Sequence, residues 1–166
     1  MGNAFPLVVA GKDGVGYQVS PALKKVLQAR TPKKFIKKDP RGFDYVEIGY
    51  VRRMLDAAFP MSWSTQADLV VPWDVISKTG QLAVKVTLTV YDLETRQEIR
   101  RVENYGSSEV KRYKQDHPTK PGHPMDIGND LKAAAADGLK KCASMLGIAQ
   151  DIYEPKVQAA VDSEKP

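Results

Sequence analysis

Residues 82–91 read LAVKVTLTVY. Every second side chain in this stretch is apolar, and the residues between are small or polar. Strict alternation of this kind predicts a β-strand of an antiparallel sheet, with one buried and one solvated face. Residues 92–95 have the composition of a turn, and residues 97–105 return with a more polar pattern. The stretch therefore predicts a β-meander, and residues 69–76, interrupted by Pro72, are expected to add an edge strand.

Helical patterns flank this meander on both sides. Residues 45–59 place Ile48, Val51 and Leu55 on one arc, with Arg52 and Arg53 on the opposite one. A second helix is expected over residues 130–146, with Asn129 as N-cap and Gly147 as the C-terminal stop. A shorter helix should begin at Ser20-Pro21. Residues 33–42 are expected to form a basic connector, and residues 113–124 a loop.

These patterns predict an α+β fold with an antiparallel β-meander sheet packed against the helices near 45–59 and 130–147. A chain of 166 residues, 42% of them hydrophobic, has the length of one domain. We expect a flexible N-terminal arm over 1–19, the domain itself over 20–153, and a polar C-terminal tail over 154–166.

The charge of the chain is concentrated in one segment. The chain has 25 Lys and Arg against 20 Asp and Glu, a net charge of +5. Residues 21–53 contain only three acids against ten basic residues: Lys24, Lys25, Arg30, Lys33, Lys34, Lys37, Lys38, Arg41, Arg52 and Arg53. Gathering like charges in this way costs self-repulsion, so it indicates a docking face for a polyanion.

The sequence lacks the motifs of several classes of protein. The single cysteine, Cys142, cannot form an internal disulfide or a cysteine-rich zinc module, and it fits a reducing interior. No apolar run approaches the roughly 18 residues of a membrane-spanning helix. The first residues do not resemble a secretory signal, so a cytoplasmic location is expected. Residues 11–16, GKDGVG, do not have the spacing of a phosphate-binding loop. No cofactor or metal is predicted, and the protein is not expected to be an enzyme.

A metal-dependent nuclease remains an alternative of another class. Its candidate ligands are Asp116, His117, His123 and Asp126. The two histidines are six residues apart in a proline-rich loop and lack helical ligand spacing, which favours an ordinary surface loop.

Two short basic segments are typical of nucleic-acid contacts. Lys140 and Lys141 follow Gly138-Leu139 on the late helix, where two cations can track a phosphate backbone. Lys111 and Arg112 precede Tyr113, and cations interleaved with an aromatic ring suit single strands. Trp63 and Trp73 are expected in a core or an interface rather than as stacking platforms.

Two segments together resemble the Rad52-type single-strand annealing family, in its phage and bacterial, DdrA-like branch. Residues 43–51, FDYVEIGYV, followed by Phe59 and Trp63, resemble the signature of the family's first helix. Residues 134–147, AAADGLKKCASMLG, resemble its later helix. The meander lies where the family has its β-hairpins, and the resemblance spans roughly residues 30–153.

The resemblance implies ATP-independent binding of single-stranded DNA and annealing of complementary strands in recombination or repair, by a homo-oligomeric ring. The family's paired cations fall on Lys140 and Lys141, and a basic residue of its first helix falls on Tyr50, with Arg52 and Arg53 nearby. A further family arginine falls on Ser144. Our own interpretation adds Lys37, Lys38, Lys111 and Arg112 as DNA contacts. The expected partners are single-stranded DNA, further copies of the chain, and a phage exonuclease or a host single-strand binding protein.

Two further alternatives stay open at this point. The protein could protect single-stranded ends without annealing them. It could also be a basic scaffold that acts through protein contacts only.

Overall fold

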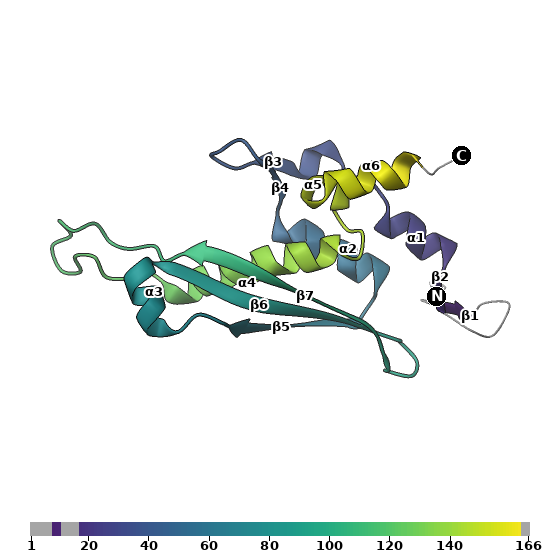
Figure 1. Cartoon of the computed structure of the whole chain (residues 1–166), viewed down its shortest axis with the longest axis horizontal. Helices are drawn as coiled ribbons and strands as arrows, with labels where there is room; N and C mark the ends of the chain where they lie inside the picture. The colour runs from purple at the N-terminus through teal and green to yellow at the C-terminus, as the bar shows by residue number, and fades with distance from the viewer. Residues whose placement is uncertain (1–7, 11–16, 164–166) are drawn as a thin grey trace. The chain divides into compact units, whose positions relative to one another are not determined.

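The computed structural model describes residues 8–10 and 17–163 of the chain. It has an α+β fold in which antiparallel sheets pack against helices, as the sequence predicts. The described residues divide into two compact units. Figure 1 draws the helices and strands of both. The first contains residues 8–10, 17–64, 89–100 and 143–163, and the second contains residues 65–88 and 101–142.

The first unit begins with a short hairpin and a capped helix. Strand β1 (Val8–Ala10) pairs antiparallel with β2 (Tyr17–Val19). The rest of the expected arm, residues 1–7 and 11–16, lies outside the described residues. Helix α1 (Pro21–Leu27) starts where predicted, because the Ser20 side chain accepts a hydrogen bond of 3.2 Å from the backbone N–H of Leu23.

The basic segment 33–46 forms a second hairpin, so the prediction of a plain connector was wrong. A short 3₁₀ turn, η1 (Lys33–Phe35), leads into β3 (Ile36–Lys38), which pairs antiparallel with β4 (Asp44–Val46). Helix α2 (Ile48–Ala58) therefore begins three residues later than predicted. We call η1, β3, β4 and their loop the basic hairpin.

Two further helices complete the first unit. They are α5 (Gln150–Tyr153) and α6 (Pro155–Ser163). The Asp151 carboxylate accepts two hydrogen bonds from Thr31, and the Tyr153 hydroxyl accepts one of 3.2 Å from the backbone N–H of Val46. Helix α6 occupies most of the segment for which the composition suggested a polar tail, and Pro155 suits its first position.

The second unit is built on a sheet with the order β5-β6-β7: β5 (Trp63–Leu69), β6 (Gln81–Tyr91) and β7 (Glu98–Glu109). The predicted alternation of β6 is confirmed, since Leu82, Val84, Val86, Leu88 and Val90 are all buried. Helix α4 (Ile127–Ser144) packs on this sheet. It starts three residues before the predicted position, because Asp126 and not Asn129 supplies the cap: its carboxylate accepts a hydrogen bond of 2.9 Å from the Asn129 N–H.

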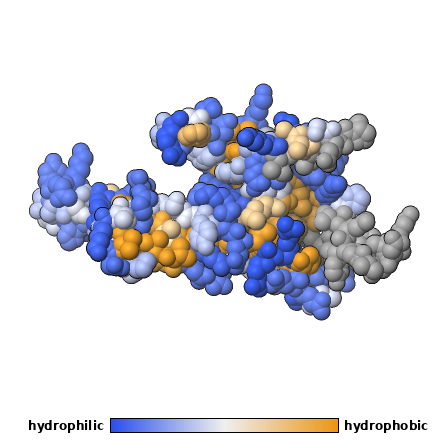
Figure 2. All heavy atoms as spheres, in the orientation of Figure 1, coloured by the Kyte–Doolittle hydropathy of each residue, from blue (hydrophilic) through white to orange (hydrophobic). Residues whose placement is uncertain are grey.

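Residues 73–79 form a helix, α3 (Trp73–Thr79), where a strand was expected. Pro72 provides a residue without an N–H at the helix start, and Gly80 ends the helix with a φ of +70°. Ile76 packs with Leu82 and Val110 in a small core. Trp73 is 53% exposed, and Figure 2 shows hydrophobic residues at the surface around α3.

Helix α4 crosses β7 at very short range. A Cβ atom added at Gly106 would lie 1.9 Å from the carbonyl oxygen of Ala134 and 2.3 Å from the backbone nitrogen of Gly138. One added at Gly138 would lie 2.5 Å from a methyl group of Val86. The two glycines let the helix and strand backbones touch, which fixes the part of α4 that carries Lys140 and Lys141.

Among the described residues, every helix is too short or too polar to cross a membrane.

Candidate nucleic-acid interface

The loop of the basic hairpin is held in place by one carboxylate. Asp39 accepts hydrogen bonds of 2.9 Å from the backbone N–H groups of Arg41 and Phe43, and two more from the Arg41 guanidinium. Desolvation raises the pKa of Asp39, but these hydrogen bonds outweigh it and the net shift is downward. Gly42, with a φ of +90°, completes the turn. The loop therefore presents Arg41 and Phe43 in one defined arrangement.

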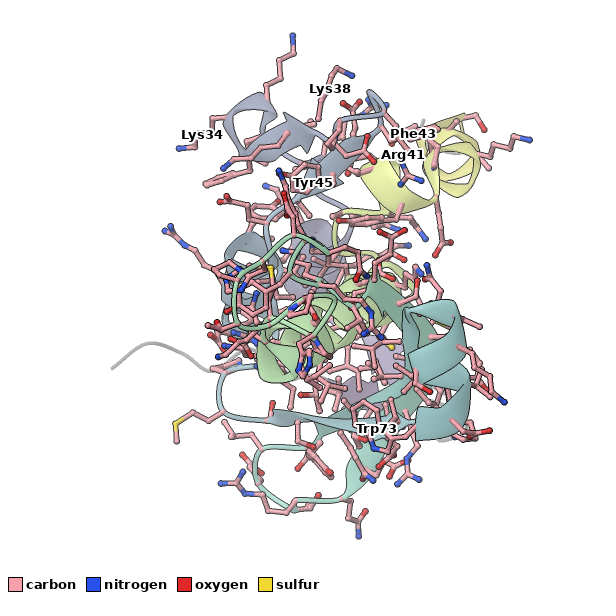
Figure 3. The ribbon with its side chains drawn as sticks, turned by 90° about the vertical axis from the view of Figure 1, so that its left-hand side faces the viewer. Lys34, Lys38, Arg41, Phe43, Tyr45 and Trp73 are labelled. Carbon is pink, nitrogen blue, oxygen red and sulfur yellow. The ribbon has the colours of Figure 1, made fainter. Side chains whose placement is uncertain are left out.

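Cations lie over aromatic rings on this hairpin. The Lys34 ammonium is 5.0 Å from the ring centroid of Phe35, and the Arg41 guanidinium carbon is 5.5 Å from that of Phe43. Phe43 is 66% exposed, and Figure 3 shows Lys34 and Lys38 reaching away from the ribbon. An exposed ring beside cations is what an unpaired base and its phosphate require.

Lys37 and Lys38 lie on β3, as part of the same hairpin. Lys37 forms an ion pair with Glu47, and the Lys38 ammonium lies 2.8 Å from the Asp44 carboxylate. All four side chains are about half exposed or more, so these pairs are worth little and are screened by salt. Both lysines can exchange their carboxylate partners for phosphates at small cost.

The three candidate contacts on helix α2 differ in exposure. Arg52 and Arg53 are exposed, as predicted. Tyr50 is buried, with its ring centroid 4.8 Å from that of Phe35. Burial raises the pKa of the Tyr50 hydroxyl, against a hydrogen bond with Thr31 that lowers it. Tyr50 thus packs against the basic hairpin through Phe35 and is not exposed for contact with DNA.

Lys140 and Lys141 lie near the C-terminal end of α4, and both side chains are partly exposed. The Lys141 ammonium is 2.8 Å from the Asp137 carboxylate and donates a hydrogen bond of 3.1 Å to the Tyr105 carbonyl. The position of the further family arginine holds Ser144, which is buried and donates a hydrogen bond to Glu154. Lys141 is therefore anchored on β7 and can reach a phosphate only beside Asp137.

Lys111 and Arg112 are exposed after the end of β7. The backbone N–H of Lys111 donates to the buried Asp130 carboxylate at 3.1 Å, and the Arg112 guanidinium donates to the Gly122 carbonyl at 3.0 Å. The Tyr113 ring in the same loop lies against the His117 ring, with the centroids 4.5 Å apart and the planes tilted by 47°. The loop is thus an ordered basic element.

The predicted contacts fall into the two units. The first unit carries Lys37, Lys38, Tyr50, Arg52 and Arg53, and the second carries Lys111, Arg112, Lys140 and Lys141. Arg41 belongs to the basic segment and Phe43 to the family-like segment 43–51, but neither was predicted as an individual DNA contact. The segment Asp39-Pro-Arg-Gly-Phe43 has the composition of a turn that presents a cation and a ring, and this signal could have identified them.

The alternative metal site finds no support in the side-chain arrangement. In the part of the chain that the structure describes, no three His, Cys, Asp or Glu side chains are placed to share a metal ion. The Nδ1 atom of His117 accepts hydrogen bonds from the backbone N–H groups of Thr119 and Lys120. This histidine serves the turn of its own loop.

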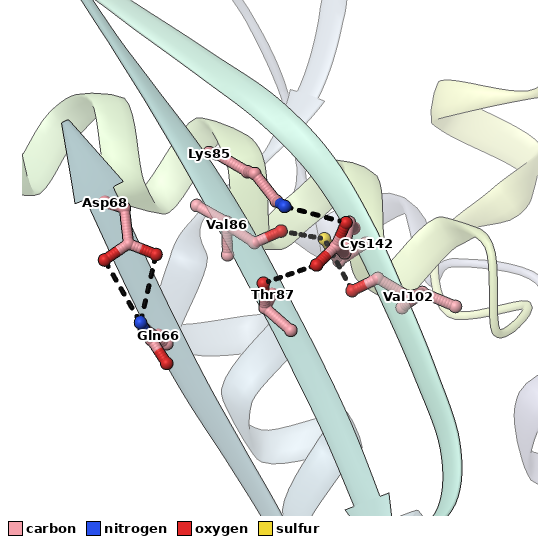
Figure 4. A network of polar contacts seen from close by, with 8 residues as sticks. Gln66, Asp68, Lys85, Val86, Thr87, Val102 and Cys142 are labelled. Carbon is pink, nitrogen blue, oxygen red and sulfur yellow. Dashed lines mark hydrogen bonds and ion pairs between the residues drawn. The ribbon is translucent and has the colours of Figure 1, made fainter. Parts of the chain in front are cut away.

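The Cys142 thiol lies between β6 and β7, as Figure 4 shows. It donates to the Val86 carbonyl at 3.4 Å and is fully buried. Desolvation raises its pKa to about 11. Because the thiolate is the reactive form, we expect no reaction with a thiol reagent in the native protein and full reaction in urea. Rapid labelling of the native protein would contradict this burial.

The solvated face of the sheet carries a polar network. The Lys85 ammonium lies 2.9 Å from Glu103, which also accepts a hydrogen bond from Thr87. The hydrogen bond from Lys85 lowers the pKa of Glu103, against desolvation that raises it.

Because the pKa of Glu103 is lower in the folded protein than in the unfolded chain, the ionised carboxylate stabilises the fold. This stabilisation is fully present at a pH above the pKa of the unfolded chain, and it is lost as the pH falls through the pKa of the folded protein. The melting temperature of Glu103→Gln should therefore fall less than that of the wild type between about pH 5 and pH 3. Equal falls would show that the pair contributes nothing.

Comparisons with known proteins add little to this geometry. No protein-family model and no curated protein matches the chain. Among solved structures, it is similar to a putative lipoprotein from Caulobacter crescentus CB15, with a TM-score of 0.36 and 15% identity over 80% of this chain and 96% of that one. A likeness this weak supports no statement about function.

Proposed function

We propose that this protein binds single-stranded DNA and anneals complementary strands without ATP, as a homo-oligomeric ring of the Rad52 type. The observation that carries the proposal is the order of two family-like segments, residues 43–51 and 134–147, with antiparallel strands between them. The first runs from the basic hairpin into α2, and the second covers the end of α4 that carries Lys140 and Lys141.

The side chains exposed on the basic hairpin and near the C-terminal end of α4 support this proposal. Annealing requires that phosphates be neutralised while the pairing edges of the bases stay accessible. Lysines that exchange surface carboxylates for phosphates meet the first requirement. An exposed ring such as Phe43 meets the second, because stacking engages the face of a base and leaves its edge free.

A binding titration tests the first half of the proposal. Fluorescence anisotropy of a labelled oligonucleotide, measured in EDTA and without nucleotide, should show tight binding of the single strand and weaker binding of the matching duplex. Affinity should fall as salt is raised. A protein that shows no affinity for the single strand at low salt would instead be a scaffold acting through protein contacts.

The cations of α4 give a specific prediction. In the double variant Lys140→Ala, Lys141→Ala, the slope of log K against log salt should decrease by about 1.4, or about 0.7 for each lost phosphate contact on a single strand. The double variant Lys78→Ala, Lys132→Ala removes the same charge from exposed positions and should keep the wild-type slope. Equal slopes in the two variants would remove Lys140 and Lys141 from the interface.

A further inference from the structure

Strand β5 is the least covered part of the sheet. None of its residues is buried, and Thr65, Gln66, Ala67, Asp68 and Leu69 are all exposed, whereas β6 is buried at every second position. It is also an edge strand, since the order of the sheet is β5-β6-β7. A strand with both faces and one edge in solvent gains little from burial and is open to pairing with another chain.

The two edges of the sheet differ in how they are protected. On β7, the Tyr105 carbonyl accepts a hydrogen bond from Lys141, and the Ser107 N–H donates one of 3.1 Å to Asp137. Side chains of α4 thus occupy backbone groups along that edge. Directly after β5, the backbone N–H of Val70 donates to the Ala83 carbonyl, which is on β6. By alternation, the backbone groups of Thr65, Ala67 and Leu69 point away from the sheet.

No side chain among the described residues bonds to these outward groups on β5. The edge that lacks protection is therefore β5, and it is the one that can accept a new strand.

The surroundings of β5 favour a protein partner over DNA. No lysine or arginine occurs between Trp63 and Ser77, so β5 and the segment after it supply no cation for phosphates, and Lys85 on the neighbouring strand is paired with Glu103. Four large apolar residues just beyond and at the end of the strand are 38% to 53% exposed: Leu69, Val70, Trp73 and Val75. An apolar patch next to an open strand edge is typical of an interface between proteins.

We propose that two copies of this chain pair through their β5 strands, antiparallel about a two-fold axis at Ala67. In this register Gln66 lies opposite Asp68 of the partner subunit, and Thr65 lies opposite the partner's Leu69. The Gln66 amide already donates to its own Asp68 carboxylate at 3.0 and 3.1 Å, so donor and acceptor also match across the axis. No like charges oppose each other, and the small Ala67 side chain stands at the axis.

The pairing joins two three-stranded sheets into one of six strands. A two-fold contact closes after two copies, so it does not itself build a ring and adds a second kind of contact to any ring interface. It needs no DNA. The proposal therefore stands or falls independently of strand annealing.

Cross-linking in the absence of DNA tests this pairing. The variant Ala67→Cys places a thiol at the axis, at a separation that suits a disulfide. The native Cys142 is buried and leaves the background low. Mild oxidation of Ala67→Cys should give a covalent dimer on a non-reducing gel. The control Ser107→Cys, exposed on the opposite edge, should remain a monomer on the same gel.

A proline variant provides an independent test. Ala67→Pro removes an N–H that points away from β6, so the sheet within each copy keeps its hydrogen bonds. Sedimentation should show loss of the dimer contact with the melting temperature nearly unchanged. The pairing is wrong if Ala67→Cys cross-links only when mixed with Ser107→Cys, or does not cross-link. It is also wrong if Ala67→Pro sediments as the wild type does.

Discussion

Replacing Gly106 with alanine is expected to lower the free energy of unfolding by about 3 kcal/mol, as overpacking of a tight core does. The added Cβ would meet the Ala134 carbonyl oxygen at 1.9 Å and the Gly138 nitrogen at 2.3 Å. Both are backbone atoms of α4 and cannot turn aside as the end of a side chain could. The helix must move away from β7 as a whole, which also weakens the contact between Lys141 and Tyr105.

Gly49→Ala is the matched control for this change. A Cβ at Gly49, near the start of α2, meets nothing within 4 Å. Alanine restricts the unfolded chain there without a clash, so stability should rise by about 0.5 to 1 kcal/mol. Urea unfolding measures both variants. If Gly106→Ala were as stable as the wild type, α4 could not cross β7 as closely as described.

Removing four charges from the basic hairpin should have the largest effect on DNA binding. In the variant with Lys33, Lys34, Lys37 and Lys38 changed to Gln, the salt slope should decrease by up to about 2.8, at about 0.7 per phosphate contact. The two ion pairs lost with Lys37 and Lys38 are on the surface, so the melting temperature should change little. Anisotropy titrations at several salt concentrations measure the slope.

The control keeps the total charge equal. Changing Lys78, Arg100, Lys132 and Lys156 to Gln removes four exposed cations outside the hairpin and outside the basic segment 21–53. If both variants weaken binding equally, net charge and not the hairpin attracts DNA. A separate variant, Phe43→Ala, should weaken binding about fivefold or more at any salt concentration, because base stacking on a ring is worth about 1 to 3 kcal/mol.

The sequence predicts best the elements whose burial pattern is periodic. Strand β6 and the buried face of α2 around Val51 and Leu55 are found where expected, because their apolar spacing matches one secondary structure only. The strand expected over residues 69–76 is replaced from Trp73 onward by α3, because Pro72 starts a helix here instead of interrupting a strand of β-branched residues. The basic hairpin was missed because its strands are three residues long, too short to show alternation.

The rest of the candidate interface depends on which side chains contact one another in the fold. The spacing of residues along the sequence does not predict these contacts. The exposure of Arg52 and Arg53 follows from helical geometry and was predicted. The contact of Lys141 with Tyr105 depends on the crossing at Gly106, which joins segments far apart in the sequence. The burial of Tyr50 depends on Phe35, which only the fold of the hairpin brings against it.

Strand annealing in EDTA, without ATP, is the most direct measurement of the proposed function. Two complementary oligonucleotides carrying a fluorescence donor and acceptor are mixed with and without the protein. The account predicts that the protein greatly accelerates duplex formation, and that the hairpin variant does so far less. Pairing at the uncatalysed rate despite tight binding would identify a protector of single strands, and would contradict annealing.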